Sequence, residues 1–546
     1  MRAPTRRPGK ETEPVSPCGS EPYAYEDEDS DRSTWRARIA RYACPAWFLR
    51  SGQATERALR SDDQRFSDPA WSSDPGYRCL RRAYEKWRHL TLTAAEAPFL
   101  PAWRRRQVQF LAQILTDAMA PTNFLPGNPA ALRRAAETRG MSLVRGADNF
   151  MDDLVHRRGR PAKTLPGTHR VGRDLAATPG RVVYRNDLME VLQYEPQTAE
   201  VHQVPLLLVP AWVNKFYIFD LAPGRSITEW AVREGFTVFT VSFRDPGPDQ
   251  AGFGLDDYFL RAPVRAMDVV QEITGSPRVH LVGACAGGML AAATAAWFTA
   301  EGKARVASLT LLMSAMDFTK ETGDEKPPPM ETSLLTRMLS NRKGLVDGER
   351  ISFLFDLLRS PDTIWQPLAL GWLMGERPRP FDILTWSEDG IDVPGPLFEQ
   401  MLRITAENTL ARGLMTIKDR TIDLSTVTQD AFVVAGSRDH IISWETVYRS
   451  ARLLGGEVAF HLVPSGHAGS IISPPRPRAE YRTGRVGLPA DPRNWWAGSS
   501  THHESWWQSW SRWLVPRSGP PVRGRTTGSA RHPAGAPAPG RYVLSR

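Results

Sequence analysis

The segment Val279–Ala300 constrains the fold of this chain more than any other part of its sequence. The apolar run Val279–Val282 has the length of a buried strand, and the uncharged, alanine-rich run Met289–Ala300 has the length of a helix. Between them stands the sequence Gly-Ala-Cys285-Ala-Gly-Gly. Glycines are needed where a strand turns directly into a helix, because side chains beside such a turn would collide. The segment therefore predicts a tight turn that presents Cys285 at the end of a strand.

Apolar runs elsewhere in the chain alternate with helical patterns. The predicted strands are Arg181–Tyr184, Met189–Tyr194, Val204–Val209, Thr237–Phe243, Ala307–Met313, Ala431–Ala435 and Val458–Val463. The predicted helices between them are Ser226–Glu234, Leu260–Thr274 and Trp444–Leu454. Runs that are apolar throughout indicate strands buried on both faces, so we predict an α/β fold with a mostly parallel sheet covered by helices.

Composition divides the chain into further parts. Residues 1–34 are rich in Pro, Ser and acidic residues and are predicted to be disordered, and residues 35–180 predict a mostly helical N-terminal domain. The catalytic domain is predicted at 181–514, interrupted at about 319–428 by a helical, Trp-rich segment that would form a cap over the strand ends. Residues 515–546 are a basic Pro/Gly-rich tail, which we expect to be a solvated extension.

Charge and cysteine content exclude several classes of protein. The formal net charge is +9, but much of the excess lies in residues 515–546, which contain arginines and no acidic residue, so we expect no nucleic-acid partner. Leu281–Phe298 is uncharged but consists mostly of Ala and Gly, which insert weakly into bilayers, so we expect no transmembrane segment. No signal peptide is visible. Four cysteines without metal-ligand spacing predict free thiols in a reducing compartment.

Two later segments supply partners for Cys285. The strand Ala431–Ala435 runs into a turn that contains Asp439, and the next strand is followed by Pro-Ser-Gly-His467. Nucleophile, acid and histidine occur in this order in α/β-hydrolases, where the acid and the histidine follow late strands. A thiol at the N-terminus of a helix also has a lowered pKa, which favours the thiolate. We therefore predict an α/β-hydrolase fold with a Cys285–Asp439–His467 triad; the turn alone would also suit a buried structural cysteine.

The remaining site residues follow from the same geometry. One donor to an oxyanion would be the backbone N–H of Ala286, directly after the nucleophile. The second would come from the loop after Val204–Val209, where we favour the Val213 amide. His440 adjoins the acid and is interpreted as structural.

These features resemble the polyhydroxyalkanoate synthases. The similarity covers roughly residues 60–514, and Ala538–Val543 extends it toward the end. Two departures, Met289 after the double glycine and Ser387 in the cap run, concern substrate preference and the cap rather than the triad. The motifs that carry the resemblance are Phe66–Trp71, Pro121–Phe124, Thr178–Asn186, Asn214–Leu221, Gly283–Gly288, Thr385–Asp389, Gly436–Ile441, Ser465–His467, Asn494–Trp496 and Ser505–Trp507.

The resemblance implies an acyltransferase that polymerises (R)-3-hydroxyacyl-CoA into polyester and releases CoA through an acyl group on Cys285. His467 would act as general base; Asp439 would either orient and charge the imidazole or assist the substrate hydroxyl. The resemblance implies no metal and no cofactor, because the CoA thioester is a substrate. It also implies a cytoplasmic protein on polyester granules, a homodimer, and an N-terminal domain linked to both. The alternatives are a thioesterase or polyester depolymerase on the same scaffold, and a non-catalytic granule-surface protein.

Overall fold

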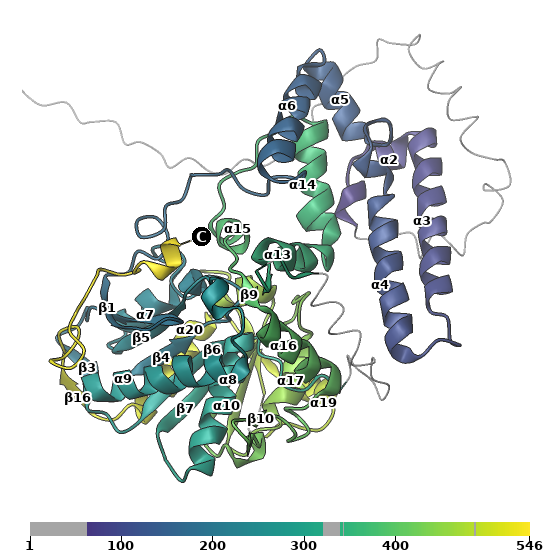
Figure 1. Ribbon diagram of the computed structural model, residues 1–546. Coiled ribbons are helices and arrows are strands. Elements are labelled where there is room, and N and C mark those ends of the chain that lie inside the picture. The colour runs from purple at the N-terminus through teal and green to yellow at the C-terminus, as the bar shows by residue number, and fades with distance from the viewer. Residues whose placement is uncertain (1–62, 320–338, 342, 485–486, 546) are drawn as a thin grey trace, which may run out of the picture.

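A ten-stranded sheet forms the centre of the larger part of the molecule (Figure 1). The computed structural model describes residues 63–319, 339–341, 343–484 and 487–545. The strand order is β1-β2-β5-β4-β6-β7-β12-β13-β14-β15. The pairs from β5 to β13 are parallel, and the strands at both edges pair antiparallel. The bounds are β1 Gly180–Arg185, β2 Met189–Tyr194, β4 Leu206–Val209, β5 Val238–Phe243, β6 Val279–Ala284, β7 Val306–Leu312, β12 Ala431–Gly436, β13 Val458–Val463, β14 Tyr481–Thr483 and β15 Ser500–His502.

Helices cover both faces of this sheet, and successive residues of its central strands point into two separate cores. Leu207 and Leu281 belong to one core, whereas Leu208 and Val282 belong to the other. This alternation explains why these strands are apolar throughout. The predicted α/β class is confirmed. The covering helices are α7 Ile227–Arg233, α8 Leu255–Phe259, α9 Arg265–Thr274, α10 Ala286–Ala300, α17 Trp444–Ala451, α19 Pro492–Gly498 and α20 Trp506–Leu514.

The predicted helix Leu260–Thr274 begins earlier than expected. The structure has a continuous helical segment from Leu255 to Thr274, in which η7 (Leu260–Val264) forms a widened turn. Pro263 lies in that turn and lacks a backbone N–H, so a regular α-helical hydrogen bond cannot form there. Gly275 ends the segment in the left-handed conformation, with φ of 67°.

The N-terminal region is helical and lies beside the cap, away from the sheet (Figure 1). Its own small core contains Phe66, Trp71, Tyr84 and Ala120. Asp74 caps the longest helix by accepting from the Gly76 amide at 2.7 Å. The elements are η2 Gln64–Phe66, α2 Ala70–Ser73, α3 Pro75–Ala95, α4 Ala102–Ala118, η3 Pro121–Asn123, η4 Leu125–Gly127, α5 Pro129–Glu137 and α6 Met141–His156. Residues 1–34, predicted to be disordered, lie outside the described residues.

The segment predicted as a cap is largely helical and lies over one edge of the sheet (Figure 1). Helix α6 packs against the cap turn η9 (Ala369–Leu373): the Asn149 side chain donates to the carbonyl oxygens of Gly371 and Glu376. Residues 320–338 lie outside the described part. The cap elements are β8 Leu345–Val346, α13 Gly348–Leu357, η8 Pro361–Trp365, α14 Gln366–Leu368, η9 Ala369–Leu373, α15 Asp382–Glu388, β9 Val393–Pro394, α16 Gly395–Glu407, β10 Thr416–Ile417, β11 Arg420–Thr421 and η10 Leu424–Thr426.

The basic tail is not a solvated extension, and that expectation is wrong for residues 515–545. Strand β16 (Pro521–Arg523) pairs antiparallel with β3 (Glu200–His202), and the Val182 amide donates to the Ala536 carbonyl at 2.9 Å. Val543 is buried in one of the two cores. Composition misled the prediction because the backbone, the apolar residues and two of the arginines of this segment contact the domain: Arg517 pairs with Asp430, and Arg525 donates to the Thr274 carbonyl.

Two further expectations concern cysteines and membranes. Cys285 is free, as expected, whereas Cys18 and Cys44 lie outside the described residues. Leu281–Phe298 divides between β6, the turn and α10, and no helix in the described ranges is long and apolar enough to cross a membrane.

Candidate active site

Cys285 stands in a tight turn between β6 and α10. Its φ of 53° and ψ of −123° lie outside the ordinary regions for a residue with a side chain, so the surrounding structure must hold it there. The Cys285 amide donates to the Leu312 carbonyl of β7 at 2.9 Å. A Cβ on Gly283 would lie 2.5 Å from both the Gly287 oxygen and the Gly288 Cα, so only glycine fits before the turn. The strained, sterically closed turn was predicted from the sequence.

The turn also places the thiol at the N-terminus of a long helix. Cys285 is the N-cap of α10, and its carbonyl oxygen accepts from the Gly288 amide at 3.0 Å. The helix spans Ala286–Ala300 and is almost wholly buried, so little water screens its dipole. Cys285 itself is partly exposed. A nucleophile needs this combination of access and a field that favours the thiolate.

Asp439 follows β12 and is fixed by its own turn. Its Oδ1 accepts from the amides of Ile441 at 2.8 Å and Ile442 at 3.0 Å. Its Oδ2 lies 2.6 Å from Nδ1 of His467, and only 1% of the Asp439 side chain is exposed. With one oxygen held by the backbone, the other can orient an imidazole.

His467 follows β13 and begins the short helix α18 (His467–Ile471). Its Nδ1 is hydrogen-bonded to Asp439, and Cys285 lies near enough to act on its pKa. Burial by itself would lower the pKa of His467, but the hydrogen bonds and negative charges of Asp439 and Cys285 outweigh it and raise the pKa to about 10. The structure thus brings the three predicted triad residues together, with a protonated imidazole between two acidic groups.

The predicted oxyanion loop follows β4 and lies against the first turn of α10. A Cβ on Gly287 would collide with the carbonyl groups of Val209 and Pro210, so that loop approaches the helix backbone closely. Ala286, the other predicted donor, is the first residue of α10 and is partly buried. The Val213 carbonyl accepts from the Ile391 amide of the cap at 3.3 Å. The roles of the Ala286 and Val213 amides stay predictions.

Sequence reasoning missed the residues that hold this loop. The Lys215 carbonyl accepts from the Trp386 indole at 2.8 Å, and Tyr217 Oη donates to Asp389 at 2.9 Å. These residues belong to the motifs Asn214–Leu221 and Thr385–Asp389, to which the resemblance gave no role. The motifs were the available signal, but only the fold shows that they touch.

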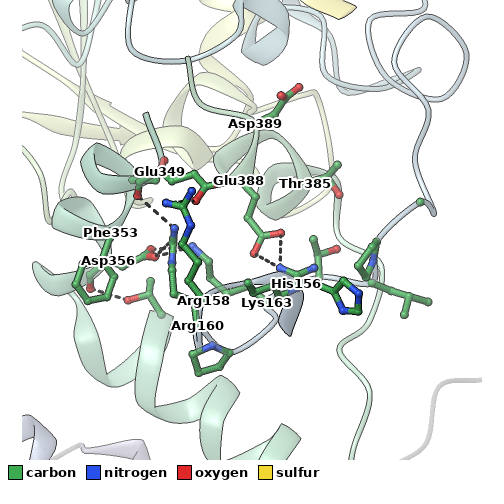
Figure 2. A pocket seen from close by; sticks show the side chains of 18 of the residues that line it. His156, Arg158, Arg160, Lys163, Glu349, Phe353, Asp356, Thr385, Glu388 and Asp389 are labelled. Atoms are coloured by element: carbon green, nitrogen blue, oxygen red, sulfur yellow. Dashed lines mark hydrogen bonds and ion pairs between the residues drawn. The ribbon is translucent and has the colours of Figure 1, made fainter. Parts of the chain in front are cut away.

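A cavity with a volume of about 1270 Å³ lies between the linker that follows α6 and the cap. Figure 2 shows basic side chains of the linker facing acidic ones of the cap across it. Arg157 pairs with Glu388 at 3.3 Å, and Lys163 pairs with Asp356 at 2.8 Å. Lys215 and Tyr217 also line the cavity, but none of the three triad residues does. Its cations are largely neutralised by neighbouring carboxylates.

The sheet order, the turn at its centre and the late Asp–His pair define the class of the protein as an α/β-hydrolase fold with a thiol at the nucleophile position. The description "alpha/beta hydrolase fold" matches residues 204–474, and "Poly-beta-hydroxybutyrate polymerase (PhaC) N-terminus" matches residues 62–231. The chain belongs to the poly(3-hydroxyalkanoate) polymerase family, whose members are acyltransferases.

Relatives match the chain over nearly all of its length. Poly(3-hydroxyalkanoate) polymerases 1 and 2 of Ectopseudomonas oleovorans are 37% and 39% identical to it over 90% and 89% of this chain, and 88% and 87% of their own. The poly(3-hydroxyalkanoate) polymerase subunit PhaC of Cupriavidus necator is 35% identical over 89% of this chain and 83% of its own. The similarity therefore includes the N-terminal helical region as well as the sheet.

Proposed function

We propose that this chain polymerises (R)-3-hydroxyacyl-CoA into a polyester and releases CoA, with Cys285 as the nucleophile that carries the acyl group. The observation that carries the proposal is the position of His467, which is hydrogen-bonded to Asp439 and whose pKa is raised by Asp439 and by Cys285 at the strained turn. The family membership supports the substrate class, and this geometry supports the choice of residues.

Acylation of Cys285 is the first half of the proposed reaction. The Cys285 thiolate attacks the thioester carbonyl and forms a carbon–sulfur bond, and negative charge develops on the carbonyl oxygen. The amides of Ala286 and Val213 are the donors proposed for that oxygen. The carbon–sulfur bond to CoA then breaks, and His467 gives its proton to the departing thiolate. One thioester replaces another of similar energy, so the acyl group stays activated.

Elongation uses the same imidazole in the opposite direction. The neutral His467 takes the proton of a substrate 3-hydroxyl while the hydroxyl oxygen attacks an acyl thioester. An ester forms, and the thiol of that thioester is released. Asp439 holds the imidazole orientation through Nδ1. Transfer to an alcohol rather than to water requires water to be kept from the acyl group, a role that we assign to the cap.

The proposal includes association with polyester granules in the cytoplasm and a homodimer, with no cofactor. Exposed apolar side chains of the N-terminal region support attachment to an apolar surface: Phe99, in the turn between α3 and α4, is 83% exposed, and Val155 on α6 is 69% exposed. Further exposed apolar side chains of the same region include Leu90, Leu111, Leu115, Val144 and Met151.

The test is CoA release from (R)-3-hydroxybutyryl-CoA and a medium-chain homologue, together with the mass of insoluble polymer. Polymer and CoA from the wild type, with Cys285→Ala lowering both at least about 10³-fold, is the expected result because the nucleophile is lost. Unchanged thermal unfolding of the variant serves as the control for folding. CoA release with only free hydroxy acid would instead make the protein a thioesterase, and absence of turnover would leave the non-catalytic granule protein.

A further inference from the structure

Lys215 is a buried cation that the proposed chemistry does not use. Only 2% of its side chain is exposed. Its ammonium donates to the carbonyl oxygens of Val543 at 2.8 Å and Ser545 at 2.7 Å, and Asp389 Oδ1 lies 4.0 Å away. A buried ammonium is costly unless its donors and its charge are matched. Here the tail supplies two acceptors and the cap supplies the opposite charge.

The backbone around Lys215 is held from the cap side as well. The carbonyls of Val213 and Lys215 accept from the Ile391 amide and the Trp386 indole. Asn214 forms an isolated β-bridge with Gly390, and Tyr217 donates to the same Asp389 that faces the lysine. The loop from Val213 to Tyr217 is therefore fixed between the cap and residues 543–545 of the tail.

We infer that Lys215 is a positioning residue, which holds the loop that carries the Val213 amide in register with Cys285 by anchoring it to the tail and to Asp389. This inference rests on the proposed function, because the oxyanion donor is part of it. Val213 is two residues from Lys215, so a change in the anchor moves the peptide that donates the hydrogen bond. Displacing a catalytic group by about 1 Å can cost on the order of 100-fold in rate.

The experiment distinguishes an effect on the oxyanion hole from an effect on the nucleophile. Lys215→Met keeps most of the stem and removes the charge and donors, Lys215→Arg retains them, and CoA release gives kcat and KM for each. Alkylation of Cys285 by iodoacetamide, followed by mass spectrometry of its peptide, reports the thiolate alone. That reaction joins sulfur to carbon with loss of iodide and develops no charge on a carbonyl oxygen.

The expected result for Lys215→Met is a kcat lowered about 10- to 100-fold, KM within a few-fold of the wild type, and an unchanged alkylation rate. Lys215→Arg should recover part of kcat. Ending the chain at Tyr542 should lower kcat similarly. Combining this truncation with Lys215→Met should lower kcat little further, because both changes remove the same contact between Lys215 and the tail.

Arg517→Met is the matched control. Arg517 also joins a carboxylate, Asp430 at 2.8 Å, and a carbonyl, Trp513 at 2.8 Å, but it lies at the amino ends of the strands, away from the loop. It should lower stability and leave kcat unchanged.

Three results would overturn the inference: a kcat of Lys215→Met equal to that of the wild type, a parallel fall of alkylation and turnover, or fully additive effects of lysine and tail. If Lys215→Met does not fold, Asp389→Asn and the truncated chain replace it in the same measurements. A wild type without turnover would instead contradict the proposed function, so the two failures are distinguishable.

Discussion

At the scale of single residues, the site depends on how three side chains share protons. The pKa of His467 is about 10 because Asp439 and Cys285 together outweigh the effect of burial. The imidazole can therefore carry a proton at neutral pH and give it up during the proposed reaction. The two backbone amides on Asp439 Oδ1 hold the carboxylate in place, which leaves Oδ2 free to orient the imidazole.

The raised pKa of His467 predicts a pH-dependent contribution to stability. An imidazole with a pKa near 6.5 in the unfolded chain and about 10 in the folded chain stabilises the fold fully below about pH 6.5, and this stabilisation is lost as the pH rises through 10. Urea unfolding of the wild type and of His467→Gln should therefore show a stability gap at pH 6.5 that narrows by pH 9.5. A gap that stays constant or widens with pH would contradict the assignment. Repeating both measurements in a Cys285→Ala background isolates the part due to Asp439.

The three triad residues were predictable because each follows an apolar strand and their order along the chain is informative. Lys215, Trp386 and Asp389 were not, because a lysine in a loop and an acid in a helical segment carry no local signal of burial. Their contact joins positions far apart in the sequence, and only the fold brings them together.

At the scale of elements, the strand–turn–helix unit is where local sequence and fold agree best. The predicted strand Val458–Val463 is observed with the same bounds, and Val279–Val282 is extended by two residues in β6. The short strands β3, β14, β15 and β16 were missed because three residues are too few to show a period. They pair through backbone hydrogen bonds, which no side-chain pattern records.

Gly283→Ala tests whether the turn is as closed as the structure shows. The added Cβ would lie 2.5 Å from backbone atoms of Gly287 and Gly288, which cannot move without disturbing Cys285. We expect the free energy of unfolding in urea to fall by about 1–3 kcal/mol, with loss of CoA release. Gly252→Ala is the control, since a Cβ there meets nothing within 4 Å. Equal stability of the two variants would show that the turn tolerates a side chain.

At the scale of the whole molecule, the N-terminal helices and the tail both reach the cap or the loop beneath it. Helix α6 packs on η9, where Trp372 donates to Asp153 at 2.8 Å. The tail ends at the Lys215 loop. Contacts of the N-terminal helices, the cap and the tail converge on one region. A change in the N-terminal region can therefore reach the catalytic domain through the cap.

The junction between linker and cap contains a nearly buried ion pair that tests this connection. Lys163 and Asp356 are 6% and 11% exposed, and Arg160 also contacts the carboxylate at 3.2 Å. Lys163→Met would leave Asp356 without its shorter contact, which should lower the free energy of local opening at this junction by about 1–3 kcal/mol. Thermolysin should then cleave the linker 157–170 about 5- to 100-fold faster, because local opening becomes more frequent. Because thermolysin cleaves before apolar residues such as Met, fragments cut before residue 163 are identified by mass spectrometry and left out of the rate.

Arg134→Met provides the comparison for this junction. Arg134 and Glu137 are 3.7 Å apart and about half exposed, so their pair contributes little and cleavage should change less than about twofold. If Lys163→Met behaves like Arg134→Met, the linker is held by other contacts, such as Arg157 with Glu388. If only Lys163→Met opens the linker, the pair with Asp356 is what joins the N-terminal helices to the cap. Added salt screens charges, so it should then reduce the difference in cleavage rate between Lys163→Met and the wild type.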